Sequence, residues 1–156
     1  MKGPGADLYA ELRSIAEALD RIGVAYALVG GLAVSIYTVP RATEDIDVML
    51  AREDRARAIE ALRPLGFTPA GRPMPAAGGR LEIQRLTKID GKDLLPLDLL
   101  IPLDRELIAL LENVTSVELE RHRITVLDRR GLRVLKRLRG SALDRADLEA
   151  LGPEAP

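Results

Sequence analysis

Asp90-Gly91, a dipeptide typical of tight β-turns, lies between two long and largely apolar segments and constrains the fold more than any other feature. Residues 81–89 and 93–101 on either side are expected to form the two strands of an antiparallel hairpin. The rest of the chain alternates between helical and strand-like patterns. Because a purely parallel doubly wound sheet contains no such hairpin, we expect an α/β (α+β) fold, a mixed sheet with helices packed on it.

Helical periodicity is clearest near the start of the chain. Apolar residues recur every three or four positions from Leu8 to Ile22, which predicts an amphipathic helix with Asp7 as its N-cap and Gly23 just past its end. The remaining expectations are, in chain order, a buried strand over 25–29, a short helix over 32–37, a strand over 45–50, a helix over 53–64, a mobile Pro- and Gly-rich loop over 69–80, a helix capped by Asp104 and ending near 113, a strand or strand pair over 117–127, and helices over 131–138 and 144–151.

Length and composition suit one ordinary globular domain. We expect a single domain over residues 1–156, with a C-terminal helical segment at about 131–151. The absence of cysteine excludes disulfides and thiol catalysis, and it suits a cytoplasmic location. The first residues lack the apolar run of a signal peptide, and no stretch is long enough for a membrane span, so no membrane partner is expected.

The charge balance argues against a protein that binds nucleic acid over its whole surface. The net charge is −1 and aromatic residues make up 3% of the chain, so neither general attraction to phosphates nor a base-stacking platform is expected. Residues 129–139 hold six basic residues between apolar ones. This segment predicts an amphipathic helix with a solvated basic face, and a contact with RNA or a triphosphate is the alternative.

Asp45 and Asp47 are the first candidate metal ligands. They are two residues apart in a predicted strand, so both side chains project from the same face. Two adjacent carboxylates repel each other unless a cation lies between them, and Mg²⁺ or Mn²⁺ suits such oxygen ligands. The alternative is a solvated pair that contacts Arg41 or Arg52.

Asp98 lies within a strand, residues 94–101, that is apolar on both faces and therefore expected to be buried. A buried carboxylate needs either a metal ion or an ionic partner. A metal ion shared with Asp45 and Asp47 is one interpretation, and a buried salt bridge to an arginine is the other. Burial of this carboxylate against a guanidinium would overturn the metal interpretation and any function that depends on it.

Gly30-Gly31 follows the predicted strand over 25–29 and precedes a helix. Glycines at this junction allow the backbone to approach a phosphate, which the amides at the helix start can bind. By itself such a pair is more often a tight turn, and neither a Walker loop nor GxGxxG is present.

Together these motifs resemble the nucleotidyltransferase superfamily that includes DNA polymerase beta, and within it the bacterial AbiEii-like group. The motifs that carry the resemblance are Leu28-Val29-Gly30-Gly31, Arg41-Ala42-Thr43-Glu44-Asp45-Ile46-Asp47-Val48 and Leu97-Asp98-Leu99, followed more loosely by Leu135-Lys136, Arg139-Gly140 and Asp144-Arg145-Ala146-Asp147-Leu148.

The resemblance implies a role for each matching residue. Asp45 and Asp47 would bridge two Mg²⁺ (or Mn²⁺) ions, and Asp98 would complete the catalytic one. The residues assigned to the nucleotide are Gly30 and Gly31, which would hold the triphosphate, with Arg41, Thr43 and Lys136 beside the phosphates. A solvated surface position is the alternative for Lys136.

The predicted function is Mg²⁺-dependent transfer of a nucleoside monophosphate from an NTP to an acceptor hydroxyl. The AbiEii-like resemblance implies the toxin of a toxin–antitoxin pair, with the 3′ end of a tRNA as one acceptor and an antitoxin protein as a partner. Two other classes stay open, a non-catalytic nucleotide-binding or regulatory module and a structural partner without a nucleotide site. His122, the only histidine, is interpreted as an incidental strand residue.

Overall fold

The computed structural model describes residues 4–38, 45–119, 121–139 and 142–152. The helices are α1 (Pro4–Arg21), α2 (Gly30–Tyr37), α3 (Arg55–Leu62), α4 (Arg105–Ile108), α5 (Arg129–Arg139) and α6 (Ala142–Leu151). The strands are β1 (Tyr26–Val29), β2 (Ile46–Leu50), β3 (Thr68–Pro69), β4 (Met74–Ala76), β5 (Leu81–Asp90), β6 (Asp93–Pro102), β7 (Val114–Leu119) and β8 (His122–Leu127). Short 3-10 turns flank α3, precede β5 and follow α4, at Arg52–Asp54, Arg63–Leu65, Ala77–Gly79 and Ala109–Glu112.

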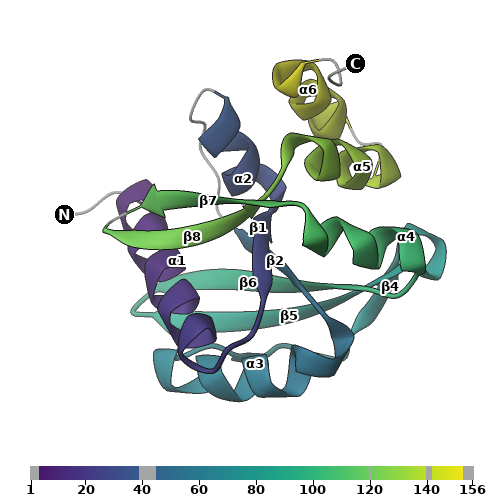
Figure 1. Cartoon of the computed structure of the whole chain (residues 1–156). Coiled ribbons are helices and arrows are strands. Elements are labelled where there is room, and N and C mark those ends of the chain that lie inside the picture. Colours follow the sequence, from purple (N-terminus) through teal and green to yellow (C-terminus); the bar gives the residue numbers. More distant parts are fainter. Residues whose placement is uncertain (1–3, 39–44, 120, 140–141, 153–156) are drawn as a thin grey trace.

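These strands form one mixed sheet in the order β3-β5-β6-β2-β1-β8-β7, with β4 paired to β5 (Figure 1). At its centre β2 runs antiparallel to β1 and parallel to β6, and β1 runs parallel to β8. The hairpins β5–β6 and β7–β8 are antiparallel. The mixed α/β architecture expected from the sequence is therefore confirmed.

The helices cover the sheet in two groups. In Figure 1, α1 packs beside α3 and against β8, whereas α2, α5 and α6 gather at the top of the view, beyond the end of β1. No helix of the described residues is both long enough and apolar enough to cross a membrane.

The predicted amphipathic face of α1 is buried. Leu12, Ile15 and Leu19 are each fully excluded from solvent, which stabilises the fold by roughly 1.5–3 kcal/mol per side chain. The helix begins at Pro4, so the prediction of Asp7 as N-cap is wrong. Proline is suited to a first helical turn because its φ is already helical and that turn needs no amide donor.

Glycine ends α1 as expected. Gly23 has φ +71° and donates its N–H to the carbonyl of Asp20, while the amide of Val24 reaches back to the carbonyl of Leu19. Asp104 is confirmed as the cap of α4, where its carboxylate accepts from the Leu107 amide at 2.8 Å.

The expected loop over 69–80 contains a strand. β4 pairs with β5 through Met74↔Ile83 and Ala76↔Leu81. Proline is compatible with an edge strand because one side of such a strand makes no ladder hydrogen bonds, so the prolines of this segment do not prevent pairing. As a result, Ala76 is held beside Leu81, the first residue of β5.

The turn of the β5–β6 hairpin lies one residue later than a turn centred on Asp90-Gly91. Asp90 pairs with Asp93, so Gly91 and Lys92 occupy the turn, and Gly91 has φ +64°. This register brings Arg85 directly opposite Asp98.

Candidate active site

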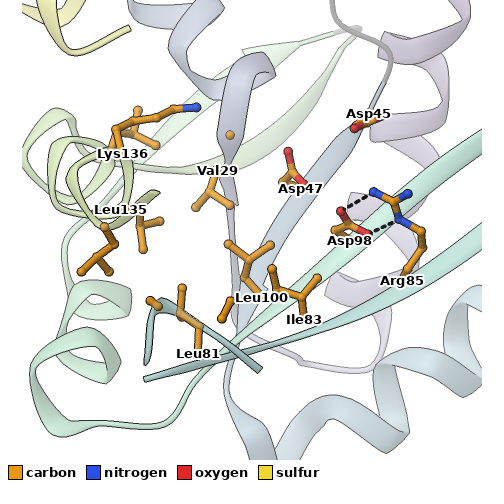
Figure 2. A pocket seen from close by; sticks show the side chains of 15 residues that line it. Val29, Asp45, Asp47, Leu81, Ile83, Arg85, Asp98, Leu100, Leu135 and Lys136 are labelled. Carbon is orange, nitrogen blue, oxygen red and sulfur yellow. Dashed lines mark hydrogen bonds and ion pairs between the residues drawn. The ribbon is translucent and has the colours of Figure 1, made fainter. Parts of the chain in front are cut away.

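A pocket of about 560 Å³ opens between the central strands and α5 (Figure 2). This volume is in the range of small-molecule and cofactor sites. It is lined by Val29, Gly30, Asp45, Asp47, Ala76, Ala77, Leu81, Ile83, Arg85, Asp98, Leu100, Leu132, Leu135, Lys136 and Leu138. Carboxylates cluster at one end of the pocket, and apolar side chains form the wall at the other.

The three predicted carboxylates line this pocket together. Asp47 and Asp98 are register partners on the parallel strands β2 and β6, whose backbones are about 4.8 Å apart in any sheet. Asp45 immediately precedes β2 and projects from the same face as Asp47 because side chains alternate along a strand.

Gly30 lies against one of these carboxylates. A Cβ added at Gly30 would be 2.2 Å from Oδ2 of Asp47, a distance that no side chain tolerates. Gly30 also has φ +74°, which an L side chain rarely adopts. Because Gly30 is the first residue of α2, the Asp47 carboxylate lies at the positive end of that helix.

Gly31 has a different environment. It is not among the described residues that line the pocket, and its carbonyl accepts a hydrogen bond from Oγ of Ser35 at 3.0 Å, within α2. Of the glycine pair, only Gly30 therefore borders the pocket.

Asp98 is paired with Arg85, the alternative that the sequence left open. Nε of Arg85 is 2.8 Å from Oδ1 of Asp98, and Nη2 is 3.0 Å from Oδ2, a bidentate arrangement. The Asp98 side chain is 12% exposed and that of Arg85 is 49% exposed. The hydrogen bonds and charge of Asp98, helped by the charges of Asp45 and Asp47, raise the pKa of Arg85 above its usual value. The guanidinium therefore acts as the local counter-ion of the carboxylate cluster.

The carboxylates of Asp45, Asp47 and Asp98 are of a chemical type that suits a divalent cation, but their positions do not form a metal-binding cluster. In the described chain no group of three or more His, Cys, Asp and Glu side chains is arranged to hold a metal ion. Aspartate oxygens are the ligands that Mg²⁺ and Mn²⁺ prefer, and the Asp47–Asp98 register brings two of them to one face. The residue types present therefore fit such an ion, although Asp98 is paired with Arg85 in this structure.

Lys136 is an inward-facing residue of α5. It is only 4% exposed, and it reaches from α5 toward the junction of β1 and α2 (Figure 2). The alternative of a solvated surface charge is therefore wrong. Burial of an ammonium is unfavourable away from anions, and the carboxylates lining the same pocket supply negative charge.

Other basic residues of α5 hold the C-terminal helix. Arg133, 5% exposed, donates from Nε to the Gly152 carbonyl at 2.7 Å and from Nη2 to the Leu151 carbonyl at 2.9 Å. Arg129 donates to the Leu151 carbonyl at 3.1 Å and to the Tyr37 carbonyl at 2.9 Å. The segment is therefore not the uniformly solvated basic face expected from its sequence.

Some predicted residues do not enter the site. Arg41 and Thr43 lie outside the described residues, as do the side chains of Arg139, Asp144 and Asp147. His122 lies on β8, where its Nε2 is 2.9 Å from Oδ2 of Asp20 on α1, and it does not line the pocket described above.

Sequence reasoning missed Arg85 and the apolar wall. The wall residues come from separate parts of the chain, namely Ala76, Ala77, Leu81, Ile83, Leu100, Leu132, Leu135 and Leu138. In the sequence they are indistinguishable from core positions. Arg85 lies opposite Asp98 only in the observed hairpin register, which differs by one residue from a turn centred on Asp90-Gly91.

This mixed sheet, with a helix starting at a glycine and carboxylates on the neighbouring strands β2 and β6, defines the nucleotidyltransferase fold. By sequence, residues 11–77 match the model of the aminoglycoside-2″-adenylyltransferase family. No curated protein matches the chain by sequence.

Several solved structures share the fold. An antigenic nucleotidyltransferase-like protein from Paracoccidioides brasiliensis is 17% identical with a TM-score of 0.65, covering 92% of this chain and 74% of that one. The lincosamide antibiotic adenylyltransferase LnuA, bound to lincomycin, is 15% identical with a TM-score of 0.59, covering 91% and 94%. ANT(2″)-Ia in complex with adenylyl-2″-tobramycin is 12% identical with a TM-score of 0.63, covering 93% and 87%.

Proposed function

We propose that this protein transfers a nucleoside monophosphate from an NTP to an acceptor hydroxyl, with Mg²⁺ or Mn²⁺ bound by Asp45, Asp47 and Asp98. The observation that carries the proposal is the convergence of these carboxylates, Gly30 and the buried Lys136 on one pocket. LnuA, one of the solved structures that share the fold, is named as an adenylyltransferase, and ANT(2″)-Ia was solved with an adenylylated antibiotic.

In such a reaction each pocket residue has a separate role. The acceptor hydroxyl gives up its proton to a carboxylate of the site or to water, and its oxygen forms a bond to the α-phosphorus of the NTP. The bond from this phosphorus to the bridging oxygen breaks, and pyrophosphate leaves with the electron pair. Gly30 leaves room for the phosphates beside the start of α2, whose amides favour anions. Lys136 contributes positive charge near the departing pyrophosphate. Arg41 and Thr43 complete the proposed nucleotide site, and Gly31, which does not border the pocket, would contribute to it only through its amide at the start of α2.

The chemistry that bound Mg²⁺ supplies in a two-metal site is activation of the hydroxyl and neutralisation of the leaving group. Asp45, Asp47 and Asp98 provide the oxygen ligands and fix where that charge lies. An apolar wall on the opposite side limits access of water and strengthens electrostatic interactions in the pocket.

The apolar wall supports a small, weakly charged acceptor. A polycationic acceptor would need several carboxylates beyond the metal ligands, and Asp45, Asp47 and Asp98 are the only acidic side chains among the described residues that line the pocket. Lincomycin and adenylyl-2″-tobramycin are bound by the two adenylyltransferases of the same fold. A hydroxylated compound with a large apolar surface fits this wall better than an aminoglycoside.

The 3′ end of a tRNA is the other acceptor, and it rests on the resemblance to the AbiEii-like group, as do the toxin role and an antitoxin partner. Arg129 and Arg133 are occupied at the end of α6, which leaves fewer basic side chains for RNA. We further propose that residues 1–156 act as one domain and in the cytoplasm, where NTPs are available.

One observation favours a second candidate function. The bidentate Arg85–Asp98 pair neutralises a proposed metal ligand, as expected of a non-catalytic module that keeps the fold and the nucleotide pocket. Such a module would bind NTP and release no pyrophosphate.

Transfer of label tests the proposal. The protein is incubated with each NTP labelled at the α-phosphate, with Mg²⁺ or Mn²⁺, and with a lincosamide, an aminoglycoside or total tRNA as acceptor. We expect one acceptor to become labelled with release of an equal amount of pyrophosphate. Asp47→Asn keeps the side-chain shape but removes the charge, and we expect it to lower the rate by about 10² or more.

Outcomes without transfer of label distinguish the alternative functions. A higher melting temperature with NTP and Mg²⁺ but no pyrophosphate supports the non-catalytic module. No shift and no product with any NTP would overturn both functions.

A further inference from the structure

We propose that Arg85 is an internal cation that competes with the divalent metal ion for Asp98, and that it moves to the triphosphate when the metal binds. This inference rests on the proposed function, because it assumes a metal site at Asp45, Asp47 and Asp98. It assigns a positioning role to a residue outside the motifs of the resemblance.

The competition follows from the hydrogen-bond geometry. Both oxygens of Asp98 accept from the guanidinium, at 2.8 and 3.0 Å, so a metal ion on either oxygen would lie within a few ångströms of this positive charge. Two cations at one carboxylate also repel each other at short range. Pairing with Arg85 therefore weakens the binding of a metal ion to Asp98.

The two partners differ in freedom of movement. Asp98 lies within β6 with its side chain 12% exposed, whereas the Arg85 side chain is 49% exposed. Because about half of the Arg85 side chain is already exposed, its rotation into solvent or across the pocket leaves no cavity in the core. The arginine is thus the partner that can move.

The electrostatics give the moving guanidinium a destination. Arg85 lines the same pocket as the carboxylates of Asp45, Asp47 and Asp98, so their negative charges hold its guanidinium there. Once a divalent ion balances these carboxylates, the triphosphate becomes the strongest anion in the same pocket. Arg85 would then bind the nucleotide from the carboxylate side of the pocket, across from Lys136 (Figure 2).

Substitution of Arg85 should change the affinities for metal ion and for nucleotide in opposite directions, and this tests the proposed role. Mn²⁺ binding is measured without nucleotide, from the loss of the free Mn²⁺ signal in electron paramagnetic resonance. We expect Arg85→Gln to bind Mn²⁺ roughly three- to tenfold more tightly than wild type, because the competitor is gone. In saturating Mn²⁺, the same variant should bind a non-hydrolysable NTP analogue several-fold more weakly.

Arg55→Gln is the matched control. Nη1 of Arg55 is 3.0 Å from Oε1 of Glu82, which lies on β5, the strand that also carries Arg85. The variant therefore removes another arginine–carboxylate pair on this strand, and Arg55 does not line the pocket. It should change neither affinity. Arg85→Lys keeps the charge without the bidentate geometry, and it should fall between wild type and Arg85→Gln.

The outcomes separate the two proposals. Equal Mn²⁺ affinity in wild type and Arg85→Gln, with binding abolished in Asp47→Asn, would overturn the role of Arg85 and leave the metal site intact. An absence of Mn²⁺ binding in every variant would overturn the metal site and this inference together. Parallel losses of metal and nucleotide affinity in Arg85→Gln would show a structural role instead of a competing one.

Discussion

At the scale of single residues, Gly30 and Asp47 depend on each other. An alanine Cβ at position 30 would meet Oδ2 of Asp47 at 2.2 Å, and the backbone there has φ +74°. We expect Gly30→Ala to suffer both left-handed backbone strain, about 1–2 kcal/mol, and steric overlap with Asp47, about 1–3 kcal/mol. Urea unfolding measures the sum as a loss in the free energy of unfolding.

Gly23→Ala separates the two contributions. Gly23 has a similar φ of +71°, but nothing lies within 4 Å of the added Cβ, so this variant reports the backbone strain alone. Equal losses in the two variants would mean that Asp47 does not pack against Gly30. A larger loss in Gly30→Ala, partly relieved by adding Asp47→Ala, would support the contact.

The site residues that sequence reasoning brought together are those whose geometry is local or set by strand alternation. Asp45 and Asp47 share a face because they are two positions apart, and Asp98 was singled out because a carboxylate in an apolar strand needs a partner. The identity of that partner is not local. It is set by a residue 13 positions earlier, on another strand.

At the scale of elements, hairpin register decides which residue faces Asp98. With Asp90 and Gly91 as the two turn residues, Ile89 would pair with Lys92 and Asp98 with Ile83. With Gly91 and Lys92 in the turn, Asp98 pairs with Arg85 instead. A shift of one residue in the turn thus replaces an apolar neighbour by a guanidinium. Turn propensity identified the hairpin, but it was not precise enough to identify the ion pair.

Arg133 of α5 attaches α6 to the rest of the fold. Arg133 donates two hydrogen bonds, at 2.7 and 2.9 Å, to carbonyls at the C-terminal end of α6, where a positive charge is also favoured by the helix dipole. We expect Arg133→Met to lower the free energy of unfolding by about 1.5–3 kcal/mol, as for buried hydrogen bonds to charged groups. Amide exchange in α6 should accelerate more than in β1 or β2.

Arg130→Met on the same helix is the matched variant, because Arg130 is exposed. Its change in stability should stay within about 0.5 kcal/mol. If both variants lose the same stability, the carbonyl contacts of Arg133 contribute nothing and α6 is held by apolar packing alone.

At the scale of the whole molecule, the pocket is assembled from segments that are far apart in the chain. Its carboxylates come from β6 and from β2 with the residue before it, its glycine from α2, and its lysine and part of its apolar wall from α5. The mixed sheet was predictable because each element has its own local pattern. The apolar wall was not, because Leu81 or Leu135 looks like any core leucine until the elements are packed.

This assembly has a consequence for ligand binding. A nucleotide that contacts both the carboxylates and Lys136 must stabilise β2, β6 and α5 together, although α5 begins 27 residues after the end of β6. At a hundred times its Kd, such a ligand raises the free energy of unfolding by about 2.7 kcal/mol. We therefore expect NTP with Mg²⁺ to slow amide hydrogen exchange in all three elements. Lys136→Gln should abolish the slowing in α5 only, whereas Arg130→Gln should preserve it. Slowing confined to β2 and β6 in the wild-type protein would mean that the lysine takes no part in binding, and that α5 serves the pocket only as an apolar wall.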